Sequence, residues 1–396
     1  MRVHFDVPEF DAQLLRALTY TYYQGADIGE CLATAQYITS KDFDSWHEEW
    51  CKTANRIFHE AEESSTVGCM VSARQGFLRA SNYYRTAAFF LYSTPQDPRL
   101  VETYTKHCVA FDKALALFST PIENVQIPFE NTFLPATFFK IDSSAAPRPV
   151  LIINNGYDST RQECYFIAGA AALARGYHVL CFDGPGQGEL LIKQHLPMRH
   201  DWESVITPVI DYLVQRHDVD HSRLVLYGPS WGGYLAPRAA AFEHRLAALV
   251  ANPGQIDVME AIKLAMPDVI ELLNDDPHNQ LEKYFGQALA NVMFATKMRA
   301  KMWIHGTETL SELFRQWKQY NLKGLTQQIA CPTLILDSEN ESMSSGQAKQ
   351  LFDALICPKK YKLFTAKEGA GEHCEAGASS LSHQYMFDWL QQTLLI

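Results

Sequence analysis

The sequence predicts an α/β fold, in which a mostly parallel β-sheet is flanked by helices and joined to two further helical regions. Short apolar strands alternate with helical segments after about residue 120, which is typical of such a sheet. The residues before that point show only helical periodicity, and the alternation stops again between about 257 and 328. We therefore expect an N-terminal helical domain over 1–120 and an α/β domain over 121–396, with a helical cap inserted at about 257–328.

The N-terminal region predicts helices without a sheet. Thr94-Pro95-Gln96-Asp97-Pro98 is a break between two of the helices, because proline disfavours a helix interior. Apolar residues recur at helical spacing in five segments, at 10–23, 31–37, 43–61, 67–91 and 99–118.

The strand pattern begins near Ile122. Residues 125–128 and 137–140 predict a β-hairpin, and the strands after them are continuous apolar runs, as in a parallel sheet covered on both faces. Ligands bind such sheets at the carboxyl ends of the strands. The predicted strands are 150–154, 178–182, 224–227, 248–251, 333–336 and 361–364.

The insertion contains helical patterns at 258–273, 281–294 and 310–319. A helical insertion between two strands of a sheet is expected to cover the carboxyl edge. Together with the N-terminal helices, it would enclose a pocket for a small-molecule substrate.

Composition excludes several classes of function. The net charge of −11 leaves no basic stripe for nucleic acid. The long apolar stretch at 166–182 contains Arg175, so we expect no membrane span, and the N-terminus shows no signal peptide. The nine cysteines lack any Cys-x-x-Cys, which favours a reducing cytoplasm and no zinc site. The glycine-rich run 183–189 lacks the Gly-Lys-Ser/Thr of a phosphate loop, so it predicts a tight turn, and we expect no cofactor or metal.

The strongest chemical signal is Gly228-Pro229-Ser230-Trp231-Gly232, which has strand-forming residues before it and an alanine-rich helical stretch after it. This setting predicts a sharp strand-to-helix turn that presents the Ser230 hydroxyl as a nucleophile. The flanking glycines fit, because the turn is strained and brings two backbones close together.

A serine nucleophile needs a base, and His373 fits the chain order best. It follows the last predicted strand in the glycine-containing loop Gly369-Ala370-Gly371-Glu372-His373. The alternatives are His383, where a surface position in the terminal helix is expected, and His305 in the cap, where a substrate contact or a structural role is expected.

The acid that orients the base should follow the strand at 333–336. Glu341 takes this position by spacing, with Asp337 and Glu339 as alternatives. The oxyanion donors should be the backbone N–H of Trp231, which follows the nucleophile, and that of Tyr157, where Gly156 lets the chain turn inward.

Several motifs together resemble one branch of the α/β-hydrolase superfamily. The branch contains 2,6-dihydroxypseudooxynicotine hydrolase and fungal hydrolases that shorten pigment polyketides, and it is related to the FrsA-like group. The motifs are Asn155-Gly156-Tyr157-Asp158-Ser159-Thr160 with Glu163, the run 182–188, Gly228-Pro229-Ser230-Trp231-Gly232-Gly233-Tyr234, Gly369-Ala370-Gly371-Glu372-His373-Cys374, and Arg79-Ala80-Ser81-Asn82-Tyr83-Tyr84-Arg85.

The resemblance implies a serine hydrolase that cleaves a carbon–carbon bond next to a ketone, or an ester, in an aromatic or polyketide-like molecule. It implies a helical cap, a homodimer in many members, and the triad Ser230, Glu341 and His373, although this chain has Asn340-Glu341 where the family has an aspartate. An acyltransferase or cyclase on the same triad, or a non-catalytic binding homologue, remains open.

The residues considered for substrate binding come from three regions of the chain. Tyr84 and Arg85 are candidates to bind a phenol or carbonyl oxygen, with core packing as the alternative. The full set of candidates is Asp158, Tyr84, Arg85 and His305.

Overall fold

A computed structural model describes residues 1–265, 267–274 and 280–395 of the chain. One eight-stranded sheet forms its centre, in the order β1-β2-β4-β3-β5-β6-β7-β8. β2 is antiparallel to β1 and to β4, and every other neighbouring pair is parallel. The strands are β1 Ile122–Phe129, β2 Thr132–Phe139, β3 Arg148–Asn154, β4 His178–Phe182, β5 Val219–Pro229, β6 Ala248–Asn252, β7 Thr333–Ser338 and β8 Lys359–Phe364.

Both faces of the sheet are buried in its central strands. In β3, Val150 and Ile152 join one apolar core, and Leu151 and Ile153 join the other, because successive side chains of a strand point to opposite faces. The continuous apolar strands of the sequence follow from this double burial, and the predicted α/β fold is confirmed. The helices of this part are α6 Arg161–Cys164, α7 Ala170–Leu173, α8 Gly188–Gln194, α9 Glu203–Val214, α10 Gly232–Ala240, α17 Gln347–Ala354 and α18 Ser379–Leu394.

The N-terminal helices have an apolar core of their own, in which Phe10, Trp46 and Trp50 are fully buried. The predicted helix at 67–91 is shorter in the structure, where α4 gives way to a 3-10 turn at Phe89–Ser93. The helices are α1 Pro8–Thr19, α2 Ile28–Ala35, α3 Phe43–Thr66, α4 Met70–Ala88 and α5 Pro98–Leu115.

The inserted region is more broken than its apolar pattern indicates. The prediction of one helix at 281–294 is wrong, because Asn291 accepts hydrogen bonds from the N–H groups of Met293 and Phe294 and so begins a new helix. The helix predicted at 258–273 corresponds to α11 and α12, and residue 266 between them lies outside the described residues, as do residues 275–279. The helices are α11 Glu260–Ala265, α12 Pro267–Asn274, α13 Gln280–Tyr284, α14 Gly286–Leu289, α15 Val292–His305 and α16 Leu310–Trp317.

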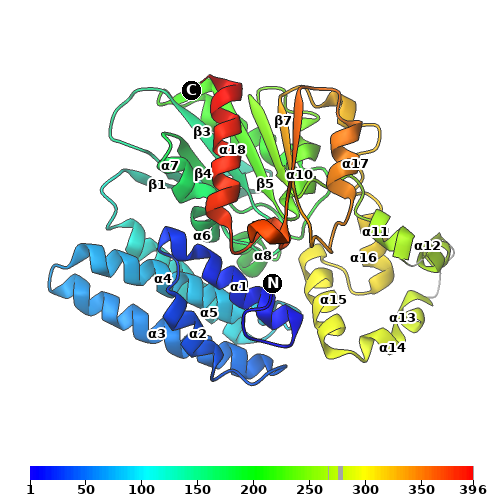
Figure 1. Cartoon of the computed structure of the whole chain (residues 1–396), viewed down its shortest axis with the longest axis horizontal. Coiled ribbons are helices and arrows are strands. Elements are labelled where there is room, and N and C mark those ends of the chain that lie inside the picture. Colours follow the sequence, from blue (N-terminus) through cyan, green and yellow to red (C-terminus); the bar gives the residue numbers. More distant parts are fainter. Residues whose placement is uncertain (266, 275–279, 396) are drawn as a thin grey trace.

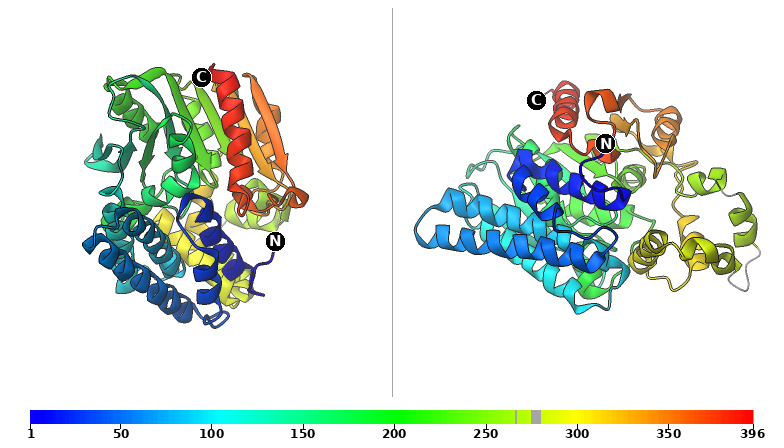
Figure 2. Two further views of the ribbon diagram at one scale, coloured as in Figure 1. Left: turned by 60° about the vertical axis from the view of Figure 1, so that its left-hand side comes forward. Right: turned by 60° about the horizontal axis from the view of Figure 1, so that its bottom comes forward.

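The two helical regions lie at the same end of the sheet. Figure 1 shows α1–α5 in blue at the lower left and α13–α16 in yellow at the lower right, and Figure 2 shows the same arrangement from two other sides. They contact the loops that follow β3 and β5, through Arg16 with Asp158 and through His305 with Trp231. Among the described helices, none combines the length and apolar character needed to cross a bilayer.

Candidate active site

Ser230 lies at a strained turn between β5 and α10. Its φ of 57° falls in the left-handed region, which is rare for a residue with a side chain. The turn requires glycine on both sides. A Cβ on Gly228 would lie 2.1 Å from the Gly232 carbonyl oxygen, and a Cβ on Gly232 would lie 2.6 Å from the Asn154 carbonyl oxygen. The Gly-x-Ser-x-Gly sequence therefore forms the sharp turn that exposes the serine at the end of a strand.

His373 lies between Ser230 and Glu341. Its Nε2 is 2.9 Å from Ser230 Oγ, and its Nδ1 is 2.5 Å from Glu341 Oε2. The three residues come from the loops after β5, β7 and β8 and form one continuous chain of hydrogen bonds. This is the arrangement in which a histidine takes a proton from serine while a carboxylate orients the ring.

The two alternative acids have other partners. Asp337 accepts a hydrogen bond from the Tyr361 hydroxyl at 2.8 Å, and Glu339 accepts one from the Ala366 N–H at 2.6 Å. Of the three carboxylates weighed from the sequence, only Glu341 is hydrogen-bonded to His373. The alternative base His383 is buried in α18 with its Nδ1 2.6 Å from the Tyr23 hydroxyl, so the expected surface position was wrong.

Glu341 is held as a carboxylate. Burial favours its neutral form, but the hydrogen bond with His373, the charge of that ring and the N–H groups of Met343 and Ser344 keep its pKa below the usual value. For His373, burial favours the neutral ring, yet the contacts with Cys374 and Glu341 outweigh it and raise the pKa well above 6.5. His373 is therefore a stronger base than a free imidazole.

Two backbone N–H groups lie beside the serine. Trp231 directly follows it, and Tyr157 follows Gly156, where a Cβ would lie 3.0 Å from the Ser230 Cβ. Within the described parts of the chain, neither the Trp231 nor the Tyr157 N–H donates a hydrogen bond to another residue. Both groups are thus available to an oxygen that binds next to Ser230.

His305 belongs to an aromatic wall above the turn. Its ring centroid lies 5.5 Å from that of Tyr157 and 6.1 Å from that of Trp231, and its Nε2 accepts a hydrogen bond from the Trp317 indole at 3.1 Å. Burial lowers the pKa of His305 to about 3, so the ring is neutral. The cap thereby packs directly on the two residues that carry the free N–H groups.

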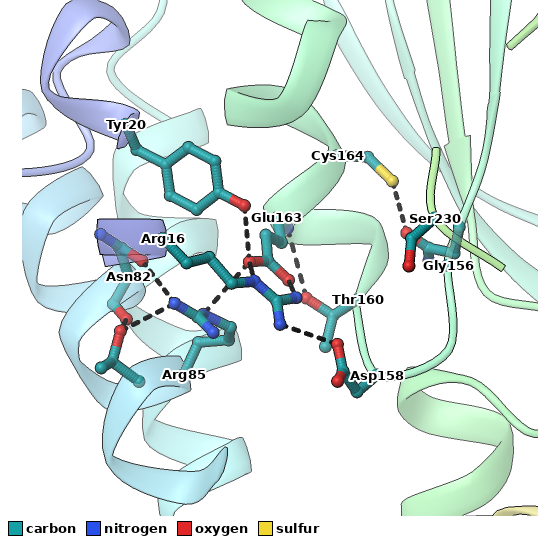
Figure 3. A network of polar contacts seen from close by, with 12 residues as sticks. Arg16, Tyr20, Asn82, Arg85, Gly156, Asp158, Thr160, Glu163, Cys164 and Ser230 are labelled. Carbon is teal, nitrogen blue, oxygen red and sulfur yellow. Dashed lines mark hydrogen bonds and ion pairs between the residues drawn. The ribbon is translucent and has the colours of Figure 1, made fainter. Parts of the chain in front are cut away.

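A network of charges connects the N-terminal helices to the loop after β3 and to α6 (Figure 3). Arg16 of α1 donates to both oxygens of Glu163, at 2.8 and 2.7 Å, and to Asp158 at 2.7 Å. Tyr20 also donates to Glu163, and Arg85 forms an ion pair with it at 3.3 Å. Arg16 was not singled out from the sequence, although it is a lone cation in the apolar segment 14–18.

Arg85 and Asp158 line a small cavity at the base of this network, together with Tyr104 of α5. Arg85 Nη1 and the Tyr104 hydroxyl are buried and find no hydrogen-bond partner among the residues that the structure describes. Tyr84 lies elsewhere, because its ring packs in the core of the N-terminal helices and its hydroxyl donates to Asn55 at 2.7 Å. The structure thus brings Arg85 and Asp158 together but not Tyr84.

A family model described as the alpha/beta hydrolase family matches residues 150–374, which span the serine turn and the histidine loop. The chain belongs to the alpha/beta hydrolase family. This α/β hydrolase is 36% identical to hydrolase LUC6 of Fusarium sp., over 97% of this chain and 96% of the relative. It is 34% identical to 20-hydroxy-prefusarin hydrolase FUS2 of Gibberella moniliformis, over 98% of this chain and 97% of the relative.

The fold of this α/β hydrolase is also similar to the crystal structure of 2,6-dihydroxy-pseudo-oxynicotine hydrolase. The TM-score is 0.76 at 22% identity, and the match covers 95% of each chain. The resemblance found in the sequence motifs is therefore confirmed at the level of the family and the fold.

Proposed function

We propose that this α/β hydrolase is a serine hydrolase that cleaves an ester, or a carbon–carbon bond next to a ketone, in an aromatic or polyketide-like small molecule. The observation that carries the proposal is the hydrogen-bond chain from Ser230 through His373 to Glu341, at distances of 2.9 and 2.5 Å. The side chains of Ser230, His373 and Glu341 do not by themselves provide a site for an oxyanion. The two unengaged N–H groups beside the serine supply that site.

In the proposed reaction, His373 Nε2 accepts the Ser230 proton while Oγ forms a bond to the substrate carbonyl carbon. The carbonyl oxygen becomes an oxyanion held by the Trp231 and Tyr157 N–H groups. When the tetrahedral intermediate collapses, the bond to the leaving group breaks, and His373 gives its proton to the departing oxygen or carbon. A water molecule, deprotonated by His373, then attacks the acyl-serine and releases the acid and free Ser230.

The walls of the site support an aromatic or conjugated substrate. The rings of Tyr157, Trp231 and His305 contact one another, Trp231 directly follows the nucleophile, and flat apolar rings favour flat apolar ligands. The names of two similar proteins, 20-hydroxy-prefusarin hydrolase and 2,6-dihydroxy-pseudo-oxynicotine hydrolase, agree with a hydrolase for small organic molecules.

The cavity between Arg85, Tyr104 and Asp158 is proposed to take an oxygen of the substrate, as a carboxylate, enolate or carbonyl. Its two free donors, Arg85 Nη1 and the Tyr104 hydroxyl, are buried without an acceptor. An oxygen of the substrate would accept their hydrogen bonds. His107 also lines the cavity, but its ring nitrogens are already bound to Ser81 and Thr160. Tyr92 and Tyr104, which line the cavity, belong to an apolar cluster against which Tyr157 and Trp231 also pack, so the cavity and the two donor residues border the same cluster.

Turnover in heavy-oxygen water tests the proposed hydrolysis. Esters of aromatic acids and aryl-substituted β-diketones are incubated with the wild-type chain and with Ser230→Ala. The products are then analysed by mass spectrometry. Hydrolysis places one solvent oxygen in the released acid, and Ser230→Ala forms no product. A lactone or an acylated acceptor without solvent oxygen would instead indicate a cyclase or acyltransferase. Equal turnover by Ser230→Ala would contradict a serine mechanism.

A further inference from the structure

Two buried glutamines flank the pair of loops that carry the free N–H groups. Gln187 follows β4 and Gln255 follows β6, and their exposed fractions are 1% and 6%. In the sheet, β4 and β6 are the outer neighbours of β3 and β5. The loops after β3 and β5 lead to Tyr157 and Trp231, so each donor loop has a glutamine on its outer side.

Gln187 donates its amide to the loop after β3. Its Nε2 lies 2.8 Å from the Gly156 carbonyl oxygen and 3.0 Å from that of Asn155. Its Oε1 accepts the N–H of Gly184 at 3.0 Å, which fixes the orientation of the amide, because only the nitrogen can donate to the two carbonyls. All three contacts join one side chain to backbone groups, so the loop after β3 is fastened to the turn after β4.

Gln255 makes the matching contact on the other side. Its Nε2 lies 2.7 Å from the Ser230 carbonyl oxygen, which also accepts the Gly233 N–H at 2.8 Å. The backbone N–H of Gln255 donates to the Gly233 carbonyl at 3.0 Å, which anchors the glutamine to the first turn of α10.

Each carbonyl that a glutamine contacts belongs to the same peptide unit as one of the two free N–H groups. A trans peptide unit is planar, and its C=O and N–H point in opposite directions. The Gly156 carbonyl shares a unit with the Tyr157 N–H, and the Ser230 carbonyl shares one with the Trp231 N–H. A hydrogen bond to either carbonyl therefore fixes the direction of the N–H on the far side. It also polarises the unit, which strengthens the N–H as a donor.

We propose that Gln187 and Gln255 are positioning residues that orient the two oxyanion donors before substrate binds. The inference rests on the proposed serine hydrolase function and extends it to two residues that touch neither the nucleophile's hydroxyl nor the reacting carbonyl. Preorganised donors lower the barrier because they need not reorient when charge develops on the oxygen. Losing Gln187 removes the side-chain donor from the Gly156 carbonyl, and losing Gln255 leaves the Ser230 carbonyl with the Gly233 N–H alone, so the donor peptide on that side is held less firmly.

The test measures how fast a fluorophosphonate probe inactivates each variant, together with the dissociation constant of an aryl trifluoromethyl ketone. This ketone binds serine as a tetrahedral oxyanion, so it reports on the donors directly. The variants are Gln187→Met, Gln255→Met and, as a variant that keeps the size and the Gly184 contact, Gln187→Glu. Gln162→Met is the matched control, because Gln162 is equally buried in α6 but its amide nitrogen contacts only the Cys108 sulfur.

We expect each of the three variants to slow inactivation and weaken ketone binding by about ten- to a hundredfold, less than the loss of a whole donor. One probe per chain still binds at completion, and the pH dependence set by His373 does not move, which separates misplaced donors from misfolding. Rates within twofold of wild type, or an equal fall in Gln162→Met, would overturn the inference. A wild-type chain that never reacts with the probe would overturn the proposed function, and this inference with it.

Discussion

Oε2 of Glu341 lies 2.5 Å from Nδ1 of His373, so the loop after β7 orients the histidine that follows β8. Glu341 can do this although its side chain is one methylene longer than that of an aspartate. Its second oxygen, Oε1, accepts the N–H groups of Met343 and Ser344 at 2.7 and 3.1 Å, and these bonds fold the side chain back on its own loop. The backbone of this loop thus fixes the position of the Glu341 carboxylate.

Replacing Glu341 by glutamine should lower kcat by about a thousandfold or more, because the amide no longer stabilises the protonated imidazole. Asp337→Asn and Glu339→Gln are the matched controls, since these residues contact Tyr361 and Ala366 instead. Steady-state kinetics on one ester measure all three. A severe loss in either control, with Glu341→Gln active, would assign the acid elsewhere.

The pH dependence of probe inactivation should follow His373. The ring must be neutral to act as a base, and its pKa is raised above 6.5, so the rate should rise with pH through that higher value. In Glu341→Gln the carboxylate that favours the charged ring is gone, and the acidic limb should move to lower pH. An unchanged limb in this variant would mean that another group controls the titration.

Glu375 should make the free energy of unfolding fall as pH rises, which is the opposite of the effect of a carboxylate whose pKa is lowered by folding. Burial raises its pKa to about 8, although hydrogen bonds from Asn252 and Ser338 oppose the shift. The folded state therefore binds a proton that the unfolded chain has lost, and the associated stability is present below pH 4.5 and is lost as pH rises to about 8.

The variant Glu375→Gln should remove this loss, which is of the order of a few kcal/mol at most. Chemical unfolding of wild type and variant between pH 5 and pH 8 measures the difference, with the exposed Glu308→Gln as control. A difference between wild type and Glu375→Gln that stays constant over this range would show that Glu375 is ionised in the folded protein.

The backbone at Gly233 lies so close to that of Pro253 that residue 233 should not accommodate a side chain. Gly233→Ala places a Cβ 1.8 Å from the Pro253 carbonyl oxygen, and neither backbone can move without breaking the turn at Ser230. We expect a loss of about 3 kcal/mol or more in the free energy of unfolding. Gly286→Ala should be near neutral, because no described atom outside the adjoining chain lies within 4 Å of the added carbon. Equal melting temperatures for the two variants would contradict the close approach.

The cavity lined by Arg85, Tyr104 and Asp158 predicts a preference for substrates with a second oxygen group. Tyr104→Phe removes only the free hydroxyl, so it should lower kcat/KM for a p-nitrophenyl hemiester of glutaric acid by about tenfold. The matched neutral ester, p-nitrophenyl butyrate, should change little. An equal effect on both esters would mean that the hydroxyl serves the fold or a structural water.

Local patterns in the sequence predicted the parts of the site that depend on local structure. Ser230 is marked by glycines that the turn needs, and His373 and Glu341 by their places after the last two strands. The missed residues act through contacts between distant segments. Arg16 and Glu163 are 147 residues apart, and Gln187 holds a peptide 31 residues before it. Their partners become visible only when the order of the strands is known. The break at Asn291 was missed because the apolar helical pattern continues across it.

Intact-mass analysis after reaction with a fluorophosphonate tests whether Ser230 is the nucleophile. We expect one adduct per wild-type chain, located on Ser230 by peptide mapping, and no adduct on Ser230→Ala. Slow but complete labelling is expected for Glu341→Gln, which keeps the serine and the base. An adduct that forms on Ser230→Ala with the same rate and stoichiometry as on wild type would show that Ser230 is not the nucleophile.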